Sequence, residues 1–530
     1  MRYLIYILSI IAILLINNAY IFSQNNSDDE NLIEADSDTN TDIPEDELGL
    51  EGIDGEKEDE GIPTEYLEAA GVNKNVNSTA NNANTQTNNS QISGNDNNSK
   101  SSSLNIAGYM SSINAIKWGG KEKDEYEVAL IRQRLHLESF YESFYFNARF
   151  EIDILSDMPW EKENIELQIG KAYFDVNLGD FIFRVGQQTV GWGKSVSGIF
   201  GVDMINPIDY RQFLLNDINE LKIPVPMMKA EWHYKKVGFE ALWIPIYIPN
   251  KYVKFGSIWY RNPLDMIPSG NSGFTPNINI NDTEYPDNNL KNSQAAAKFS
   301  ANFLGIDMDL FYEYLFNHNP VMKKTISNVS MTNSPTIEIN PKYEKMQAGG
   351  ISLETPIWDF IFKADGLFMY NNYYNYPFEP GLIDLTDPTS LANLQNNVNE
   401  YNANEGLIKK HSIRYLAGVD YTYGSPLMLS VNYLQDIILD YDKRIVNDQY
   451  TNMLISFARS MWLKDTLSFE PWLMWDINNK ATIVRFFVSY KLEDALNIII
   501  GAEFFNGAKD SNFGYFSKND LIELKFKYSF

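Results

Sequence analysis

The residues that could carry out chemistry in this sequence are few and widely spaced. The chain has 530 residues with four histidines and no cysteine, so disulfide bonds and thiolate metal sites are excluded. The histidines, His136, His233, His318 and His411, do not follow the spacing of a metal site or of a Ser/His/Asp triad. No glycine-rich loop of the P-loop type is present. The sequence therefore predicts no enzymatic activity, no cofactor and no bound metal.

A second group of polar residues is clustered in residues 191–222. This stretch is rich in glycine and proline, which permit bends and prevent regular strand pairing. We expect it to leave the surrounding sheet and to fold inward, where its charges would line a constriction. The candidate residues are Lys194, Asp203, Asp209, Arg211, Asp217 and Glu220. The alternative is that the stretch packs on a rim and that Asp209 and Arg211 form a local ion pair.

The elements that must position these charges are predicted by a period-two pattern that begins near Leu104. Apolar and polar residues alternate clearly in residues 146–154, 228–234, 306–314 and 484–491. Each pattern predicts a strand with one apolar and one polar face. The strands run about 10 residues or more, which is the length needed to cross a bilayer at a tilt. The many charges suit a water-filled lumen and disfavour the alternative, a soluble sandwich or barrel.

The whole pattern predicts an all-β fold, a transmembrane antiparallel up-and-down β-barrel. We predict 18 strands, with 16 as the alternative, at residues 104–115, 124–138, 140–154, 163–177, 180–188, 223–235, 237–247, 292–303, 305–316, 343–354, 357–371, 411–424, 425–438, 449–462, 464–476, 480–492, 493–506 and 519–530. Connections after even-numbered strands are tight, whereas many after odd-numbered strands are long. Outer-membrane barrels have short periplasmic turns and long outer loops, so an even strand number places both termini in the periplasm.

The polar faces of these strands supply the candidate lumen residues. Those that we expect to line the wall are Arg132, Arg134, Arg149, Glu151, Lys229, Glu231, Arg485 and Lys525. The two signs of charge nearly balance over the predicted lumen face, so the sequence predicts no ion selectivity.

Both ends of the chain carry export features. Residues 1–24 resemble a secretory signal, with Arg2 before a short apolar run and cleavage expected near Ser23 or Gln24; a membrane anchor is the alternative. Residues 25–103, first acidic and then rich in Asn and Ser, predict a disordered periplasmic segment that serves as a spacer, or alternatively as a tether or binding arm. The last strand ends on Tyr528 and Phe530, which resemble the C-terminal signal for the barrel-assembly machinery.

One stretch carries a family resemblance. Residues 184–195 read R-V-G-Q-Q-T-V-G-W-G-K-S, residues 203–211 read D-M-I-N-P-I-D-Y-R, and residues 223–227 read I-P-V-P-M. This run resembles an uncharacterised outer-membrane family of the porin superfamily. Its first five residues also resemble, more distantly, phosphate-selective porins. The resemblance implies a barrel and suggests transport, and it implies no particular substrate.

These observations predict a porin in the cell outer membrane of a Gram-negative bacterium, through which small hydrophilic solutes or ions diffuse passively. One alternative is a surface adhesin or structural protein that binds through loops 248–291 and 372–410. A second is a transporter for hydrophobic compounds. The net charge of −27 argues against nucleic acid as a partner. Expected partners are outer-membrane lipid, the barrel-assembly machinery and small solutes. The oligomeric state stays open, with a homotrimer as one option.

Overall fold

The computed structural model describes residues 103–118, 127–143, 146–158, 165–195, 200–212, 218–253, 257–261, 277–328, 336–378, 388–423 and 427–530. The predicted signal peptide, the predicted disordered segment apart from Ser103, and Asp217 lie outside these residues.

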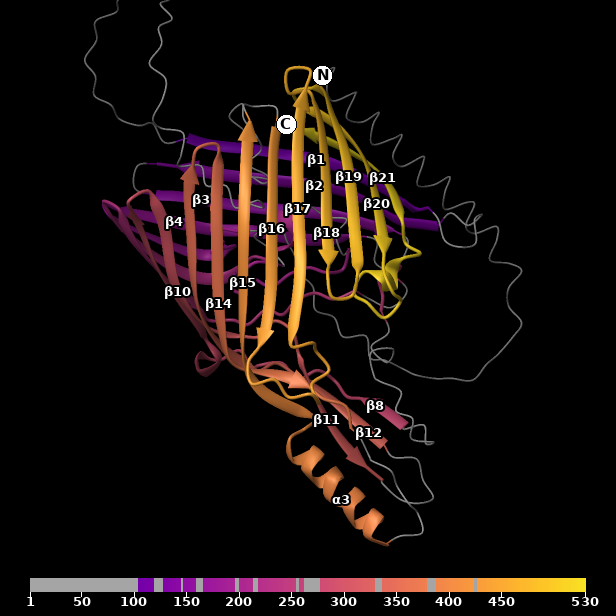
Figure 1. The fold of residues 1–530 in the computed structure, drawn as a ribbon. Helices are drawn as coiled ribbons and strands as arrows, with labels where there is room; N and C mark the ends of the chain where they lie inside the picture. Colours follow the sequence, from indigo (N-terminus) through magenta and orange to yellow (C-terminus); the bar gives the residue numbers. More distant parts are fainter. Residues whose placement is uncertain are drawn as a thin grey trace, which may run out of the picture. The chain divides into compact units, whose positions relative to one another are not determined.

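The described residues form one closed barrel of 18 strands (Figure 1). These strands are β1 (Ser103–Lys117), β2 (Glu127–Glu142), β3 (Phe146–Met158), β4 (Glu166–Leu178), β5 (Phe181–Gln188), β6 (Val225–Tyr234), β7 (Val237–Ile244), β9 (Gln294–Phe303), β10 (Ile306–Phe316), β13 (Lys345–Ile357), β14 (Phe360–Asn375), β15 (Leu407–Tyr423), β16 (Leu427–Ile438), β17 (Tyr450–Trp462), β18 (Leu467–Asp476), β19 (Ala481–Glu493), β20 (Leu496–Asn506) and β21 (Leu521–Ser529). Each pairs antiparallel with the next, and β1 pairs antiparallel with β21. The predicted fold class and the strand number of 18 are therefore confirmed.

The two faces of the wall differ as the alternation predicts. On β3, the side chains of Glu151 and Asp153 are fully buried inside the barrel, whereas Phe150 and Ile154 are 43% and 39% exposed on the outside. Outward apolar rows of this kind contact lipid, and closure leaves no strand edge to be satisfied by water. The protein is accordingly an integral outer-membrane barrel. None of the helices in the described ranges is long and apolar enough to cross a membrane.

The C-terminal residue closes the barrel. The backbone N–H of Phe530 donates to the carbonyl oxygen of Gly108 at 2.8 Å, and the N–H of Gly108 donates back at 3.0 Å. A Cβ atom at Gly108 would lie 2.5 Å from the carbonyl oxygen of His136 and 3.0 Å from the Phe530 ring. Glycine at this position therefore leaves room for the terminal ring. Recognition of Tyr528 and Phe530 by the assembly machinery stays a prediction.

The turn between β2 and β3 differs from the predicted one. The sequence pattern predicts a reversal at residue 139, whereas the chain reverses between Ser143 and Phe146. There the Ser143 hydroxyl donates to the carbonyl oxygen of Phe146 at 2.7 Å and accepts from its N–H at 3.0 Å. Aromatic residues on both sides of this serine continue the strand pattern, so period two alone does not locate the turn.

The long connections contain elements that the sequence analysis treats as loops. β8 (Asn277–Ile280), β11 (Val321–Ser327) and β12 (Thr336–Lys342) form a three-stranded sheet. Helix α3 (Pro388–Ala403) contributes Leu394, Val398 and Tyr401 to a cluster with Ile326 of β11. Figure 1 shows this sheet and α3, here called the outer unit, at the end of the barrel opposite Phe530. These elements all follow odd-numbered barrel strands, as the parity of loop lengths predicts.

Candidate functional site

The connection between β5 and β6, residues 189–224, is the inward loop. Val190, Trp192, Val202 and Ile205 of this loop are buried in one apolar cluster with inward-facing side chains of the wall. The wall residues include Phe311 and Leu315 of β10, Ala348 of β13, Leu367 of β14, Leu416 of β15 and Leu434 of β16. The loop therefore folds into the barrel, as the sequence predicts, and packs against β10 and β13 to β16.

Polar contacts fix the same side of the loop. The carboxylate of Asp365 on β14 accepts hydrogen bonds from the backbone N–H groups of Lys194 at 2.9 Å and Ser195 at 2.7 Å. The Lys194 ammonium lies 3.2 Å from Asp309 of β10. Gly193 has φ of +97°, and a Cβ atom there would lie 3.0 Å from Val202. Glycine thus permits the bend that brings this backbone to Asp365.

Two side chains hold the arms of the loop together. Asp203, whose side chain is fully buried, accepts from the backbone N–H groups of Trp192 and Ile205, both at 3.1 Å, and from the Lys222 ammonium at 2.7 Å. Asn206 accepts from the N–H of Val190 at 2.7 Å and donates to two backbone carbonyl groups. The most distinctive sequence run of the chain therefore includes the internal braces of this loop.

A second apolar cluster packs against the second half of the loop, which leads back to β6. Ile208 and Leu221 lie in it, together with side chains of β16 to β21, β1 and β2 and with Trp259 from the connection after β7. The wall residues include Met428, Phe457, Trp472, Met474, Ile483 and Phe505. Phe200 packs against both clusters. The inward loop therefore crosses the lumen between two apolar cores.

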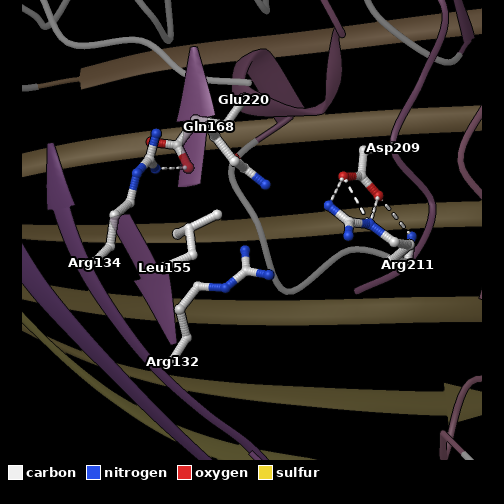
Figure 2. A pocket seen from close by; sticks show the side chains of 7 residues that line it. All are labelled: Arg132, Arg134, Leu155, Gln168, Asp209, Arg211 and Glu220. Carbon is white, nitrogen blue, oxygen red and sulfur yellow. Dashed lines mark hydrogen bonds and ion pairs between the residues drawn. The ribbon is translucent and has the colours of Figure 1, made fainter. Parts of the chain in front are cut away.

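A small polar pocket lies between the loop and the wall strands β2, β3 and β4. Arg132 and Arg134 of β2, Leu155 of β3 and Gln168 of β4 line it from the wall, and Asp209, Arg211 and Glu220 line it from the loop (Figure 2). We take this pocket as the candidate functional site.

Ion pairs connect the loop to the wall around the pocket. The Arg134 guanidinium donates to Asp153 of β3 at 2.5 Å and to Glu220 of the loop at 2.9 Å. Arg211 donates to both carboxylate oxygens of Asp209 and to Glu166 of β4 at 3.1 Å. Burial acts to raise the pKa of Asp209, but Arg211 and then Lys251 outweigh it and hold that pKa below its ordinary value.

The structure brings together only some of the predicted constriction residues. Asp209, Arg211 and Glu220 line the pocket together. Lys194 instead pairs with Asp309 of the wall, and Asp203 pairs with Lys222 within the loop. The local pair of Asp209 and Arg211, the alternative for this stretch, is also present. An inward loop and a local ion pair are therefore compatible.

The other predicted wall residues face the lumen as ion pairs away from the pocket. Arg149 pairs with Glu138 and Glu151, Lys229 with Glu231, Arg485 with Glu503, and Lys525 with Glu523. These pairs give the lumen a polar wall with both signs of charge.

Sequence reasoning did not single out Leu155, Glu166 or Gln168. The signal for the last two was present, because Ile165, Leu167 and Ile169 alternate with them and are exposed on the outer face. Period two therefore places Glu166 and Gln168 on the lumen side of β4. Their closeness to Arg211 and Glu220 depends on the path of the loop, which the pattern does not give.

Comparison with solved structures finds outer-membrane channels. OccAB1 of Acinetobacter baumannii is 9% identical and has a TM-score of 0.43, and the match covers 81% of this chain and 96% of that one. A BenF-like porin of Pseudomonas fluorescens Pf-5 is 10% identical, with a TM-score of 0.42 and coverage of 81% and 98%. OpdK of Pseudomonas aeruginosa, solved with vanillate, is 6% identical, with the same TM-score and coverage. Similarity at this level carries no argument about function.

Comparison by sequence gives a family. No curated protein matches the chain. Residues 70–374, more than half of the 530, match the family described as "Protein of unknown function (DUF1302)", and this stretch includes the whole inward loop. The protein therefore belongs to the DUF1302 family.

Proposed function

We propose that this protein is an outer-membrane channel through which small hydrophilic solutes or ions diffuse passively, with its constriction at the pocket beside the inward loop. The observation that carries the proposal is the position of the loop. Two apolar clusters pack the loop against other parts of the wall, whereas the pocket beside β2 to β4 is lined mostly by charged side chains. Water and hydrophilic solutes favour a charged passage over an apolar one.

The distribution of charge supports the same proposal. The wall contributes Arg132 and Arg134, and the loop contributes Glu220 and the paired residues Asp209 and Arg211. Asp153 and Glu166 of the wall pair with Arg134 and Arg211, so the wall and the loop each carry charges of both signs. Such a lining orders water and dipolar solutes. The lumen pairs such as Arg149 with Glu151 continue the polar lining beyond the constriction.

The alternatives stay predictions. A hydrophobic compound would have to pass the charged lining of the pocket, where desolvation of Arg132 and Arg134 is costly. Binding of host or matrix would use the outer unit, whose sheet and helix give the long loops a folded surface. Nothing in the described ranges favours either alternative over a channel.

Conductance of the purified protein in a planar bilayer tests the proposal. We expect discrete ion-conducting steps in KCl. Leu155→Trp adds bulk at the pocket without changing charge and should lower the step by roughly half. Ile154→Trp is the matched control, because this neighbour is exposed on the outer face. The absence of steps, or equal steps in the parent and Leu155→Trp barrels, would contradict the proposal.

A further inference from the structure

We propose that His318 is a positioning residue for the inward loop: its imidazole ties the loop to the connections that follow β7 and β10, and the protonation of the ring sets how firmly the loop is seated. The inference rests on the proposed function, since the inward loop forms one side of the constriction. It goes beyond that function by naming a residue outside the pocket that acts through the loop.

His318 lies two residues beyond the end of β10, at a junction of three connections. Its Nε2 atom lies 3.1 Å from the carbonyl oxygen of Met204 and 3.2 Å from that of Ile205, both in the inward loop. Its Nδ1 atom lies 3.1 Å from the carbonyl oxygen of Ile248, in the connection after β7. The Tyr247 ring stacks on the imidazole, with 6.0 Å between the ring centroids and 11° between the planes. One side chain therefore joins the inward loop to both outer connections.

Backbone contacts extend the same junction. The N–H of Asn250 donates to the carbonyl oxygen of His318 at 3.3 Å. The side-chain oxygen of Asn250 accepts from the N–H of Ile208, in the inward loop, at 2.6 Å. The connection after β7 leads to β8, and the connection after β10 leads to β11 and β12. Movement of the inward loop at this point therefore breaks contacts with both connections.

The imidazole cannot satisfy all three carbonyl oxygens when it is neutral. A neutral ring carries one N–H, whereas both of its nitrogens here face carbonyl oxygens. A second proton supplies the missing donor, but it also places a full charge on a partly buried ring. Burial lowers the pKa of His318 below its ordinary value, and the carbonyl contacts and Asp203 offset only part of this effect. The seated loop therefore favours the neutral ring.

Displacement of the loop reverses this preference. The ring then meets water and takes up its proton at the ordinary His pKa of about 6.5. Because the pKa in the seated state is the lower of the two, the stabilisation from His318 is complete above about pH 6.5 and is lost as the pH falls below that value. Acid should therefore loosen the inward loop.

Other titratable groups face the same junction. Asp203 of the inward loop pairs with Lys222. Glu313 of β10 is fully buried and lies close to Asp203 and Met204. Tyr247 covers one face of the ring. A test must therefore remove the titration of His318 and leave these groups in place.

Labelling of a buried cysteine measures displacement of the loop without using conductance. The chain has no native cysteine, and Val202 of the inward loop is fully buried. Val202→Cys is reacted with a water-soluble maleimide at about pH 7.5 and at about pH 5.5, and proteins are compared at the same pH, which removes the pH dependence of the thiol itself. His318→Gln, made in this protein, keeps an amide donor but cannot titrate. His233→Gln is the matched control, because the His233 side chain is 63% exposed and pairs only with Glu231 among the described residues.

We expect the labelling rate with His318 present, divided by the rate in His318→Gln, to rise up to about tenfold between the two pH values. His233→Gln should follow the protein that keeps both histidines. An unchanged ratio overturns the inference, because Asp203 and Glu313 remain in His318→Gln and a response from either carboxyl would appear in both proteins. His318→Asn, which also keeps an amide donor, replaces His318→Gln should the latter fail to assemble.

Conductance of the same proteins separates this inference from the proposed channel. KCl steps without a rise in labelling that depends on His318 overturn the positioning role and leave the channel standing. A rise that depends on His318, in a barrel that conducts no ions, supports the positioning role and contradicts the channel.

Discussion

The carboxylate of Asp365 on β14 accepts the backbone N–H of Ser195 at 2.7 Å, across 170 positions of sequence. Its second oxygen accepts the neighbouring N–H of Lys194. One wall side chain therefore fixes the point at which the inward loop turns across the lumen. The position of this turn determines where the apolar residues on either side of it are buried.

Replacement of Asp365 should loosen the loop without opening the wall. Asp365→Asn removes the charge and one acceptor, and a charge-assisted hydrogen bond contributes about 1.5–3 kcal/mol. We expect an assembled barrel with noisier and larger current steps. Asp175→Asn, on a wall carboxylate that pairs with Arg184, is the control. Steps as quiet as those of the parent would show that apolar packing alone seats the loop.

Shortening the loop should widen the passage. Deletion of residues 196–205 removes Val202 and Ile205 from their apolar cluster, whereas the strand pairing of β5 with β6 is independent of them. We expect higher conductance and passage of larger solutes, measured by liposome swelling. An equally long deletion of residues 389–398 in α3 should change neither quantity. Parent-like conductance in the first variant would place the constriction elsewhere.

The state of Asp209 predicts how the channel responds to acid. Because Arg211 holds the pKa of Asp209 below its ordinary value, this carboxylate stays ionised from about pH 7 to about pH 5. The ionised Asp209 carboxylate stabilises the folded protein at neutral pH, and this contribution is lost only as the pH falls through the lowered pKa of Asp209. In Arg211→Gln, burial should raise that pKa, so the reversal potential in a KCl gradient should begin to change within this range.

The double variant Arg211→Gln/Asp209→Asn is the control for this effect. It lacks the carboxylate, so the added pH dependence should disappear. The same pH profile in the single and double variants would show that another group titrates.

The chain has no native cysteine, so single cysteines report which face of β21 is wet. Lys527→Cys should react with a water-soluble maleimide, because Lys527 shares the inward row with Glu523 and Lys525. Phe526→Cys should react slowly, because its neighbours in the alternation face lipid. A register slip would put charges into hydrocarbon at a cost of about 2–4 kcal/mol each near the midplane. Equal labelling of the two positions would rule out this register.

The barrel was predictable because alternation along a strand directly encodes a wall with lipid on one side and water on the other. The pattern on β3, with Glu151 and Asp153 between apolar residues, needs no knowledge of the partner strands. The loop was predictable as an inward segment because it is long, its glycines and prolines cannot continue the wall, and it carries charges of both signs.

The apolar cores were not predictable in this way. On β18, Trp472 and Met474 face inward while Leu473 and Trp475 face outward, so the contrast between the faces is absent where loops cover the inner wall. The pocket escaped prediction because Gln168 and Glu220 line it together only through the path of the loop. Helix α3 had a signal, the spacing of Leu394, Val398 and Tyr401, within a stretch whose Asn and Tyr content suggests a loop.

The docking surface of the inward loop also bears on how the barrel is built. Trp192 and Val202 share a buried apolar cluster with Leu367 of β14 and Leu416 of β15, which follow them far along the chain. A sheet grown in chain order from β1 would carry a loop with no surface on which to dock, and its exposed apolar face would invite contact with other chains. Once β14 and β15 join the sheet, the loop can be seated. The inward loop can therefore dock only after the C-terminal half of the wall has joined the sheet.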